Sequence, residues 1–306
     1  MIGNKKVLIS GITGFIGSNI AKFLLDQEFK IIGIFRDQSD LKRCLDFKDK
    51  IGWINISNEN WQNEIINFKP DIFIHTAWEG IDAQSRNNWD IQLKNFTFSQ
   101  NIISACINGS VKKIISLGSQ AEYGLYSGKI SENYCPKPAD AYGAYKLHTS
   151  NFLKINCQDK DIHWYWLRIF SVFGPGENET WLIPHAIKSL LKNESVILTK
   201  GDQKYDYLYI EDFTKNLLQI INHEKDNSGI YNFGSGSSIS IKEFLLNLTE
   251  IIGVSYDLLK FGAVPYRAMQ SMHMESDNTL IESIFGQMVH REYKNSLIET
   301  VNNSTF

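Results

Sequence analysis

The chain has 306 residues, of which 43% are hydrophobic, and its 31 basic and 34 acidic residues give a formal net charge of −3. This length suits one large domain or two unequal ones. The charges are mixed along the sequence, which excludes a basic nucleic-acid-binding stripe and an acidic tail. The first residues lack the apolar core of a signal peptide, and the apolar runs are too short to span a bilayer. We therefore expect a cytoplasmic protein that does not enter a membrane.

Short apolar strands alternate with helical stretches through the first half of the chain. The expected strands are residues 6–10, 30–35, 51–55, 71–77, 112–119 and 162–174, and the expected helices are residues 15–27, 61–68, 88–109 and 142–157. Nearly continuous apolar strands are typical of a parallel sheet that is covered by helices on both faces. The alternation therefore predicts an α/β fold with a Rossmann-type, doubly wound parallel sheet.

The pattern loosens after Gly174, where a loop, a helix, two strands around a turn and a further helix are expected. We expect residues 1–173 to form a dinucleotide-binding Rossmann domain that carries the catalytic residues. Residues 174–306 are expected to form mainly a smaller, mixed α/β substrate-binding lobe, with part of the chain returning to the Rossmann domain.

A glycine-rich turn, "SGITGFIG", joins the first strand to the first helix and places Gly11, Gly14 and Gly17 three residues apart. Backbone N–H groups and a helix N-terminus at one point favour an anion, and glycine lets a diphosphate approach the backbone. A tight turn without a ligand also uses glycine. We expect the backbone of this turn to hold the diphosphate of a dinucleotide, and the expected contacts include Thr13, Phe15 and Ile16.

The end of the second strand, "GIFRDQ", bears on which dinucleotide binds. NAD-binding proteins usually place Asp or Glu here to accept a hydrogen bond from the ribose, but this chain has Phe35 followed by Arg36. An arginine pairs with a 2′-phosphate, which a carboxylate would repel. The sequence therefore favours NADP(H), while Asp37 keeps NAD(H) open.

Tyr142 and Lys146 lie four residues apart on an expected helix, so their side chains share one face. A neighbouring ammonium group favours the phenolate, so we expect Lys146 to lower the pKa of Tyr142. Tyr142 could then exchange a proton with a substrate oxygen. Ser119 follows a buried strand at the sheet edge where functional residues gather, and could hydrogen-bond the same oxygen.

These segments together resemble the extended short-chain dehydrogenase/reductase family, in its branch that acts on nucleoside-diphosphate sugars. Nearly the whole chain takes part, through "GITGFIG", "DIFIHTAW", "NFTFSQN", "SLGSQAEYG", "YGAYK", "LRIFSVFGPGE", "YDYLYIED" and "GAVPYR". The resemblance implies that Ser119, Tyr142 and Lys146 form a catalytic triad and that Lys146 also holds the nicotinamide ribose. It further implies a homodimer that forms through the long helices.

Other cofactor contacts follow from the same resemblance. Asn55, with Ile56 next to it, stands where the family usually has an adenine-binding Asp. Ala77 is expected to lie against the cofactor, and Asn95 matches an asparagine of the long helix that supports the active site.

Departures from the family pattern exclude two of the reactions that members of the family catalyse. Family members that dehydrate sugars have an Asp-Glu pair directly after the catalytic hydroxyl residue, where this chain has Gln120 and Ala121. Epimerase-reductases that make GDP-fucose use a Cys and a His, where this chain has Ala121 and Trp181. We therefore expect neither of these reactions.

Three functions remain after these exclusions. The favoured one is NADP(H)-dependent reduction of a 4-keto group on a nucleoside-diphosphate sugar, which would serve the biosynthesis of cell-surface polysaccharide sugars. The alternatives are a nucleotide-sugar 4-epimerase with retained NAD and a non-catalytic dinucleotide-binding sensor. Arg36 favours the reductase over the epimerase, and the intact triad disfavours the sensor.

Substrate contacts are expected from both halves of the chain. Ser119 and Gln120 are candidates in the first half. In the second half, Asn178 is a candidate diphosphate ligand, Trp181 a wall of the sugar pocket, and Arg267 a bidentate diphosphate partner. Tyr205 stands where the family usually has an arginine. The histidines lack the spacing of a metal site, so we expect no metal.

Overall fold

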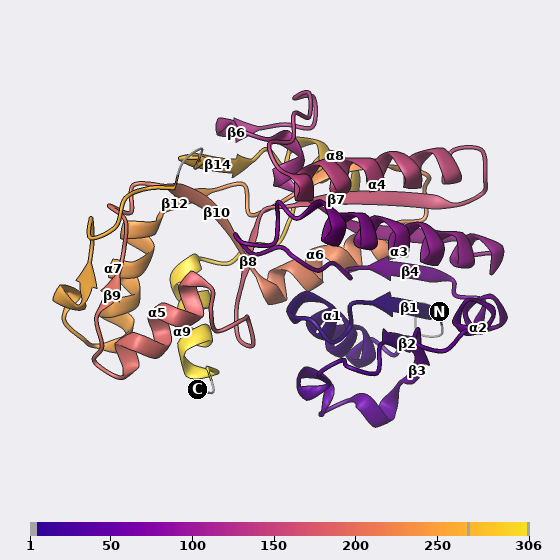
Figure 1. The fold of residues 1–306 in the computed structure, drawn as a ribbon, viewed down its shortest axis with the longest axis horizontal. Helices are drawn as coiled ribbons and strands as arrows, with labels where there is room; N and C mark the ends of the chain where they lie inside the picture. Colours follow the sequence, from indigo (N-terminus) through magenta and orange to yellow (C-terminus); the bar gives the residue numbers. More distant parts are fainter. Residues whose placement is uncertain (1–4, 268–269, 305–306) are drawn as a thin grey trace. The chain divides into compact units, whose positions relative to one another are not determined.

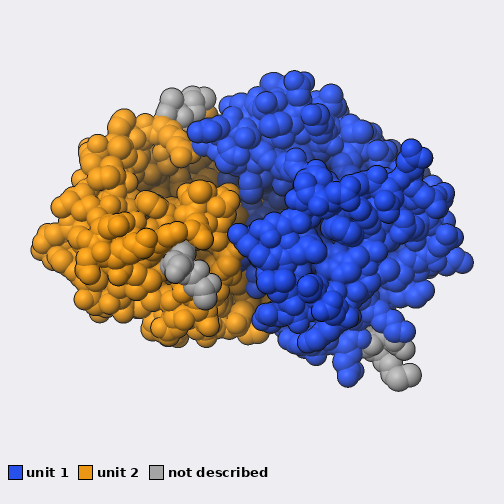
Figure 2. Space-filling view, turned by 60° about the horizontal axis from the view of Figure 1, so that its bottom comes forward, with its two compact units in different colours: residues 1–124, 135–169, 217–231 blue, residues 125–134, 170–216, 232–306 orange. Residues whose placement is uncertain are grey.

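The computed structural model describes residues 5–267 and 270–304, which form two compact units, coloured blue and orange in Figure 2. The first unit covers the described chain up to Gly124, then Cys135–Ile169 and Leu217–Tyr231. The second covers Leu125–Tyr134, Phe170–Asn216 and the described chain from Asn232. Within the described ranges, no helix is both long and apolar enough to cross a membrane.

A seven-stranded sheet organises the first unit, in the order β11-β7-β5-β4-β1-β2-β3 (Figure 1). The strands are β1 (Lys6–Ser10), β2 (Lys30–Phe35), β3 (Gly52–Asn55), β4 (Ile72–His75), β5 (Lys113–Ser119), β7 (His163–Ile169) and β11 (Gly229–Phe233). Pairing from β7 through to β3 is parallel. The predicted α/β class and Rossmann-like parallel sheet are therefore confirmed.

Helices pack on this sheet, and their ends are set by local capping. They are α1 (Phe15–Asp26), α2 (Trp61–Phe68), α3 (Trp89–Asn108) and α4 (Ala141–Cys157), with short 3₁₀ turns at Lys42–Cys44, Lys48–Lys50 and Gln120–Tyr123. Side chains of Asn88 and Asp140 accept hydrogen bonds from the first backbone N–H groups of α3 and α4, which fixes where these helices begin. α3 and α4 lie side by side (Figure 1). Beneath them Phe73, Trp164 and Trp166 belong to one buried apolar core.

The second unit contains a smaller mixed sheet, ordered β12-β10-β14-β6, with β8 also paired to β10. The helices and strands of the second unit are β6 (Ser127–Ile130), β8 (Ser171–Phe173), α5 (Leu182–Leu191), β9 (Val196–Ile197), β10 (Lys204–Tyr209), β12 (Ser238–Ser240), α7 (Ile241–Ile252), a 3₁₀ turn at Tyr256–Leu258, β13 (Leu259–Lys260), β14 (His273–Ser276), α8 (Thr279–Phe285) and α9 (Tyr293–Asn302). Of these, β9 and β13 pair with each other outside the mixed sheet. α6 (Ile210–Asn222) begins in this unit and ends in the first. Asp206 is buried, and its carboxylate accepts hydrogen bonds from Ser235, Gly236 and Ser276.

Two local expectations differ from the structure. The single strand expected over residues 162–174 is two strands, because the chain leaves the large sheet after Ile169 and residues 171–173 pair with β10 instead. The last strand residue of β4 is His75 rather than Ala77, so Thr76 and Ala77 belong to the loop beside the glycine turn.

Candidate active site

The glycine turn has a geometry that side chains would obstruct. Gly11 has φ +71°, and a Cβ on it would lie 2.6 Å from Thr76 Oγ1 and from the backbone nitrogen of Ala77. A Cβ on Gly17 would overlap the carbonyl oxygen of Gly11. Among the described residues, no side chain caps the N-terminus of α1, whose N-cap is Gly14. The first N–H groups of α1 therefore remain suited to an anionic ligand, and the cradle fits the diphosphate predicted for residues 11–17.

Replacing Gly17 by alanine is expected to abolish dinucleotide binding or to unfold the first unit. The added methyl would meet backbone atoms of Gly11, which cannot rotate away as a side chain can. Gly229→Ala is the matched control, since its nearest neighbour would be the Tyr231 side chain at 3.3 Å. Nucleotide titration and thermal unfolding check this prediction, and binding retained by Gly17→Ala would contradict it.

The predicted adenosine contacts lie at the ends of β2 and β3. Arg36 forms an ion pair with Glu79, which lies in the loop after β4. Asn55 donates to Asp37 Oδ1 at 2.6 Å and accepts from the backbone of Ser57 at 3.0 Å. Arg36 and Asn55 are thus both engaged by neighbouring carboxylates.

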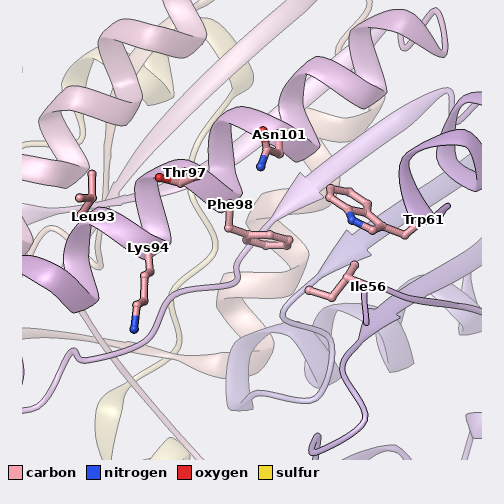
Figure 3. A pocket seen from close by; sticks show the side chains of 7 residues that line it. All are labelled: Ile56, Trp61, Leu93, Lys94, Thr97, Phe98 and Asn101. Atoms are coloured by element: carbon pink, nitrogen blue, oxygen red, sulfur yellow. The ribbon is translucent and has the colours of Figure 1, made fainter. Parts of the chain in front are cut away.

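Ile56 opens onto an apolar groove of ≈ 440 Å³ (Figure 3). Its lining residues are Ile56, Trp61, Leu93, Lys94, Thr97, Phe98 and Asn101. The rings of Trp61 and Phe98 are 6.2 Å apart, and the Lys94 side chain points away from them. An aromatic, largely apolar surface of this kind suits a flat ring, and the cofactor-binding role of Ile56 stays a prediction.

The three predicted catalytic residues converge within the first unit. Ser119 ends β5, and its side chain lies near enough to the Tyr142 hydroxyl to lower that group's pKa. Tyr142 stands in the first turn of α4, and Lys146 follows one turn later. Lys146 is 4% exposed and donates from Nζ to the carbonyl oxygen of Leu117 at 2.7 Å. The strand end and the helix start thus bring the three side chains to one place.

The pKa of Tyr142 is raised, whereas the sequence analysis expected it to be lowered. Burial raises it to about 12, and the Ser119 hydrogen bond and the Arg86 guanidinium oppose that rise only in part. The Arg86 guanidinium carbon is 5.2 Å from the centre of the Tyr142 ring. Burial also lowers the pKa of Lys146 to about 7, with Glu122 opposing the change. The expected lowering of the Tyr142 pKa is therefore wrong, because desolvation of the phenol outweighs the effects of Ser119 and of the Arg86 guanidinium.

Trp78 is a site residue that the sequence did not single out. Lys146 Nζ lies 3.7 Å from the centre of its ring, a cation–π contact, and the Trp78 and Tyr142 rings meet edge to face at 6.1 Å. The indole N–H donates to Gln92 Oε1 at 2.8 Å, which fixes the ring orientation. Its position directly after "HTA" was the only signal that could have found it.

Glu122 and Arg168 form a buried ion pair behind Ser119. Glu122 is fully buried and Arg168 is 2% exposed, and Arg168 Nε donates to Glu122 Oε2 at 2.9 Å. The other carboxylate oxygen accepts from the Ser119 backbone and from Trp166 Nε1, each at 2.8 Å. The pair therefore fixes the turn that presents Ser119, and a lone Glu in "SQAEYG" gave no sign of this in the sequence.

The other predicted residues of the first unit lie around this centre. Asn95 is 9% exposed and holds the Glu79 backbone, with Oδ1 accepting from its N–H at 3.0 Å and Nδ2 donating to its carbonyl at 2.9 Å. Ala77 packs against Gly11. Gln120 begins the 3₁₀ turn after Ser119. Their binding roles stay predictions.

Predicted substrate residues of the second unit fall into two groups. Asn178 and Trp181 share one turn, in which the Trp181 N–H donates to the Asn178 carbonyl at 3.0 Å, and Trp181 is 42% exposed. Tyr205 and Arg267 are joined through Gln270, whose Nε2 donates to the Tyr205 hydroxyl at 2.9 Å and whose Oε1 accepts from the Arg267 N–H at 3.2 Å. Arg267 is exposed, and these four roles also stay predictions.

Comparisons with known proteins support the family and the fold of this chain. A family model described as the NAD dependent epimerase/dehydratase family matches residues 7–234. The chain is 25% identical over 266 residues to an uncharacterized UDP-glucose epimerase, YtcB, of Bacillus subtilis, covering 81% of this chain and 82% of that one. It is 26% identical over 283 residues to a CDP-abequose synthase of Salmonella muenchen, covering 91% of each. A UDP-glucuronic acid 4-epimerase from Bacillus cereus, solved with UDP-glucuronic acid and NAD, has the same fold, with a TM-score of 0.85, 22% identity and coverage of 97% and 98%.

Proposed function

Because the chain belongs to the NAD-dependent epimerase/dehydratase family of enzymes, we propose that it reduces the 4-keto group of a nucleoside-diphosphate sugar with NADP(H). The two relatives named above carry the names of nucleotide-linked sugars, which supports this class of substrate. The observation that carries the proposal is the convergence of Ser119, at the end of β5, with Tyr142 and Lys146 of α4, where burial raises the pKa of Tyr142 to about 12. Such a tyrosine keeps its proton at neutral pH and is a proton donor rather than a base.

The close packing of Gly17 on Gly11 and the uncapped start of α1 support a dinucleotide site at the glycine turn. When bound, the nicotinamide cofactor supplies the hydride that the carbonyl carbon accepts. Ser119 donates a hydrogen bond to the carbonyl oxygen and so stabilises the negative charge that develops there. Tyr142 gives its proton to the same oxygen as it becomes an alkoxide. Lys146 stays beside Tyr142, where its ammonium form stabilises the phenolate that remains.

A 4-epimerase with retained NAD is the second candidate. The Arg36–Glu79 ion pair favours it, because a carboxylate beside Arg36 weakens the attraction to a 2′-phosphate. The raised pKa of Tyr142 disfavours it, since an epimerase must first remove a proton from a substrate alcohol. We therefore retain reduction as the proposed reaction.

Purified protein mixed with NADPH and 4-keto-6-deoxy sugars carried by different nucleoside diphosphates tests the proposal. We expect absorbance of NADPH to fall in step with alcohol formation for one of these substrates. Product that accumulates without net loss of NADPH would support the epimerase instead.

We also propose a homodimer through α3 and α4, which is supported by the exposed Trp89 and Ile155 on these helices.

A further inference from the structure

An ion pair crosses the carboxyl end of β1, the strand that leads into the glycine turn. β1 lies between β2 and β4 in the sheet. Arg36 directly follows β2, and Glu79 comes four residues after the end of β4. The Arg36 guanidinium and the Glu79 carboxylate are paired, so they connect the two strands that flank β1. The pair therefore borders the seat predicted for the dinucleotide.

Two amide side chains hold the Glu79 loop in place. Asn95 makes two hydrogen bonds to the Glu79 backbone, and Gln92 Nε2 donates to the Gly80 carbonyl at 2.9 Å. Asn95 and Gln92 are both buried, at 9% and 0% exposure. The Arg36 and Glu79 side chains are 43% and 57% exposed, so both are accessible from solvent. The loop is thus held rigidly while its carboxylate stays accessible.

We propose that Glu79 is a residue that selects between NAD(H) and NADP(H), by competing with the 2′-phosphate for Arg36. The inference rests on the dinucleotide seat of the proposed function. β2 ends with Phe35 where a carboxylate usually accepts from the ribose hydroxyl, and the nearby Asp37 accepts a hydrogen bond from Asn55. Glu79 supplies a carboxylate from the opposite side of β1. It accepts a hydrogen bond from a free 2′-hydroxyl and repels a 2′-phosphate, while Arg36 attracts that phosphate.

Because the charges of Arg36 and Glu79 oppose each other, we expect the natural protein to bind NADPH only slightly more tightly than NADH. Arg36 tilts binding toward NADPH, and Glu79 keeps the difference from NADH below about tenfold, because exposed charge pairs contribute little. Removing the Glu79 charge frees Arg36 for the 2′-phosphate. Removing the Arg36 charge leaves Glu79 facing that phosphate unopposed.

Fluorescence titration of the full chain with NADPH and with NADH tests this, using Glu79→Gln, Arg36→Gln and the double variant. We expect Glu79→Gln to raise the ratio of NADPH to NADH affinity about five- to tenfold, as expected for one nearby surface charge. In the Arg36→Gln background the same change should shift the ratio less, since the two residues act on the same phosphate. Titration with 2′,5′-ADP and AMP should show the same pattern, because these probes differ only in the 2′-phosphate.

Asp161→Asn is the matched control. Asp161 pairs with Lys112 at 3.1 Å, just before β5 and therefore at the opposite end of the strands. The Asp161→Asn substitution removes one exposed carboxylate from the same unit, and it should leave the ratio of NADPH to NADH affinity unchanged. Tight binding of both nucleotides with an unchanged ratio in Glu79→Gln would overturn this inference alone. Failure of the natural protein to bind either nucleotide would overturn it together with the proposed function.

Discussion

Replacing Tyr142 by phenylalanine is expected to lower turnover by about two to four orders of magnitude, the usual effect of losing a positioned proton donor. The phenylalanine ring keeps the edge-to-face contact with Trp78 and the position beside Lys146. Only the hydroxyl, which is the proposed proton donor, is lost. Steady-state rates measured with saturating NADPH, alongside a nucleotide titration, should show turnover lost and binding kept.

Tyr145→Phe provides the matched control for this experiment. Tyr145 stands on the same helix, and its ring packs against Trp89, Phe96 and His148 rather than against Ser119. Removing its hydroxyl should leave turnover within about threefold of the natural protein, as for surface changes away from a site. If Tyr142→Phe and Tyr145→Phe behaved alike, Tyr142 would not be the proton donor.

Glu122→Gln is expected to destabilise the protein by about 3–5 kcal/mol, the range for breaking one partner of a buried ion pair. The change leaves the Arg168 guanidinium buried without its counter-charge. Equilibrium unfolding in urea measures the free energy of unfolding directly. If the free energy of unfolding falls this far, we also expect Ser119 to be less firmly positioned, because Glu122 Oε1 accepts a hydrogen bond from the Ser119 backbone N–H.

Glu122→Leu combined with Arg168→Met separates the charge effect from simple packing. Replacing both partners removes the unpaired charge, so the double variant should be more stable than Glu122→Gln. A Glu122→Gln protein as stable as the natural one would show that the pair is not the support that the structure indicates.

Much of the fold follows from local sequence patterns. The glycine turn and six of the seven strands of the large sheet could be predicted, because a buried parallel strand reads as a short apolar run and the turn sits directly between strand and helix. The seventh strand, β11, was not predicted. β6 could not be predicted, since it is only four residues long and pairs with β14, more than a hundred residues later in the chain. Such pairing depends on tertiary contacts that no local pattern records.

The sequence could predict that Tyr142 and Lys146 lie close together, but not the electrostatics around them. Spacing alone brought Tyr142 and Lys146 to one helix face, which the structure also shows. The direction of the Tyr142 pKa shift depends on how completely the phenol is desolvated, and that is a property of the packed fold. Glu79 was missed for a similar reason. Its pairing with Arg36 arises only because β2 and β4 flank β1 in the sheet.

Transfer of deuterium is the most direct test of the proposed reduction. The protein should be mixed with NADPH that carries deuterium at nicotinamide C4 and with the 4-keto sugar nucleotide that the screen identifies, and the product examined by NMR. We expect deuterium at C4 of the sugar, with one NADPH oxidised for each product molecule. A product whose C4 carries no deuterium, formed while NADPH stays unchanged, would contradict the account.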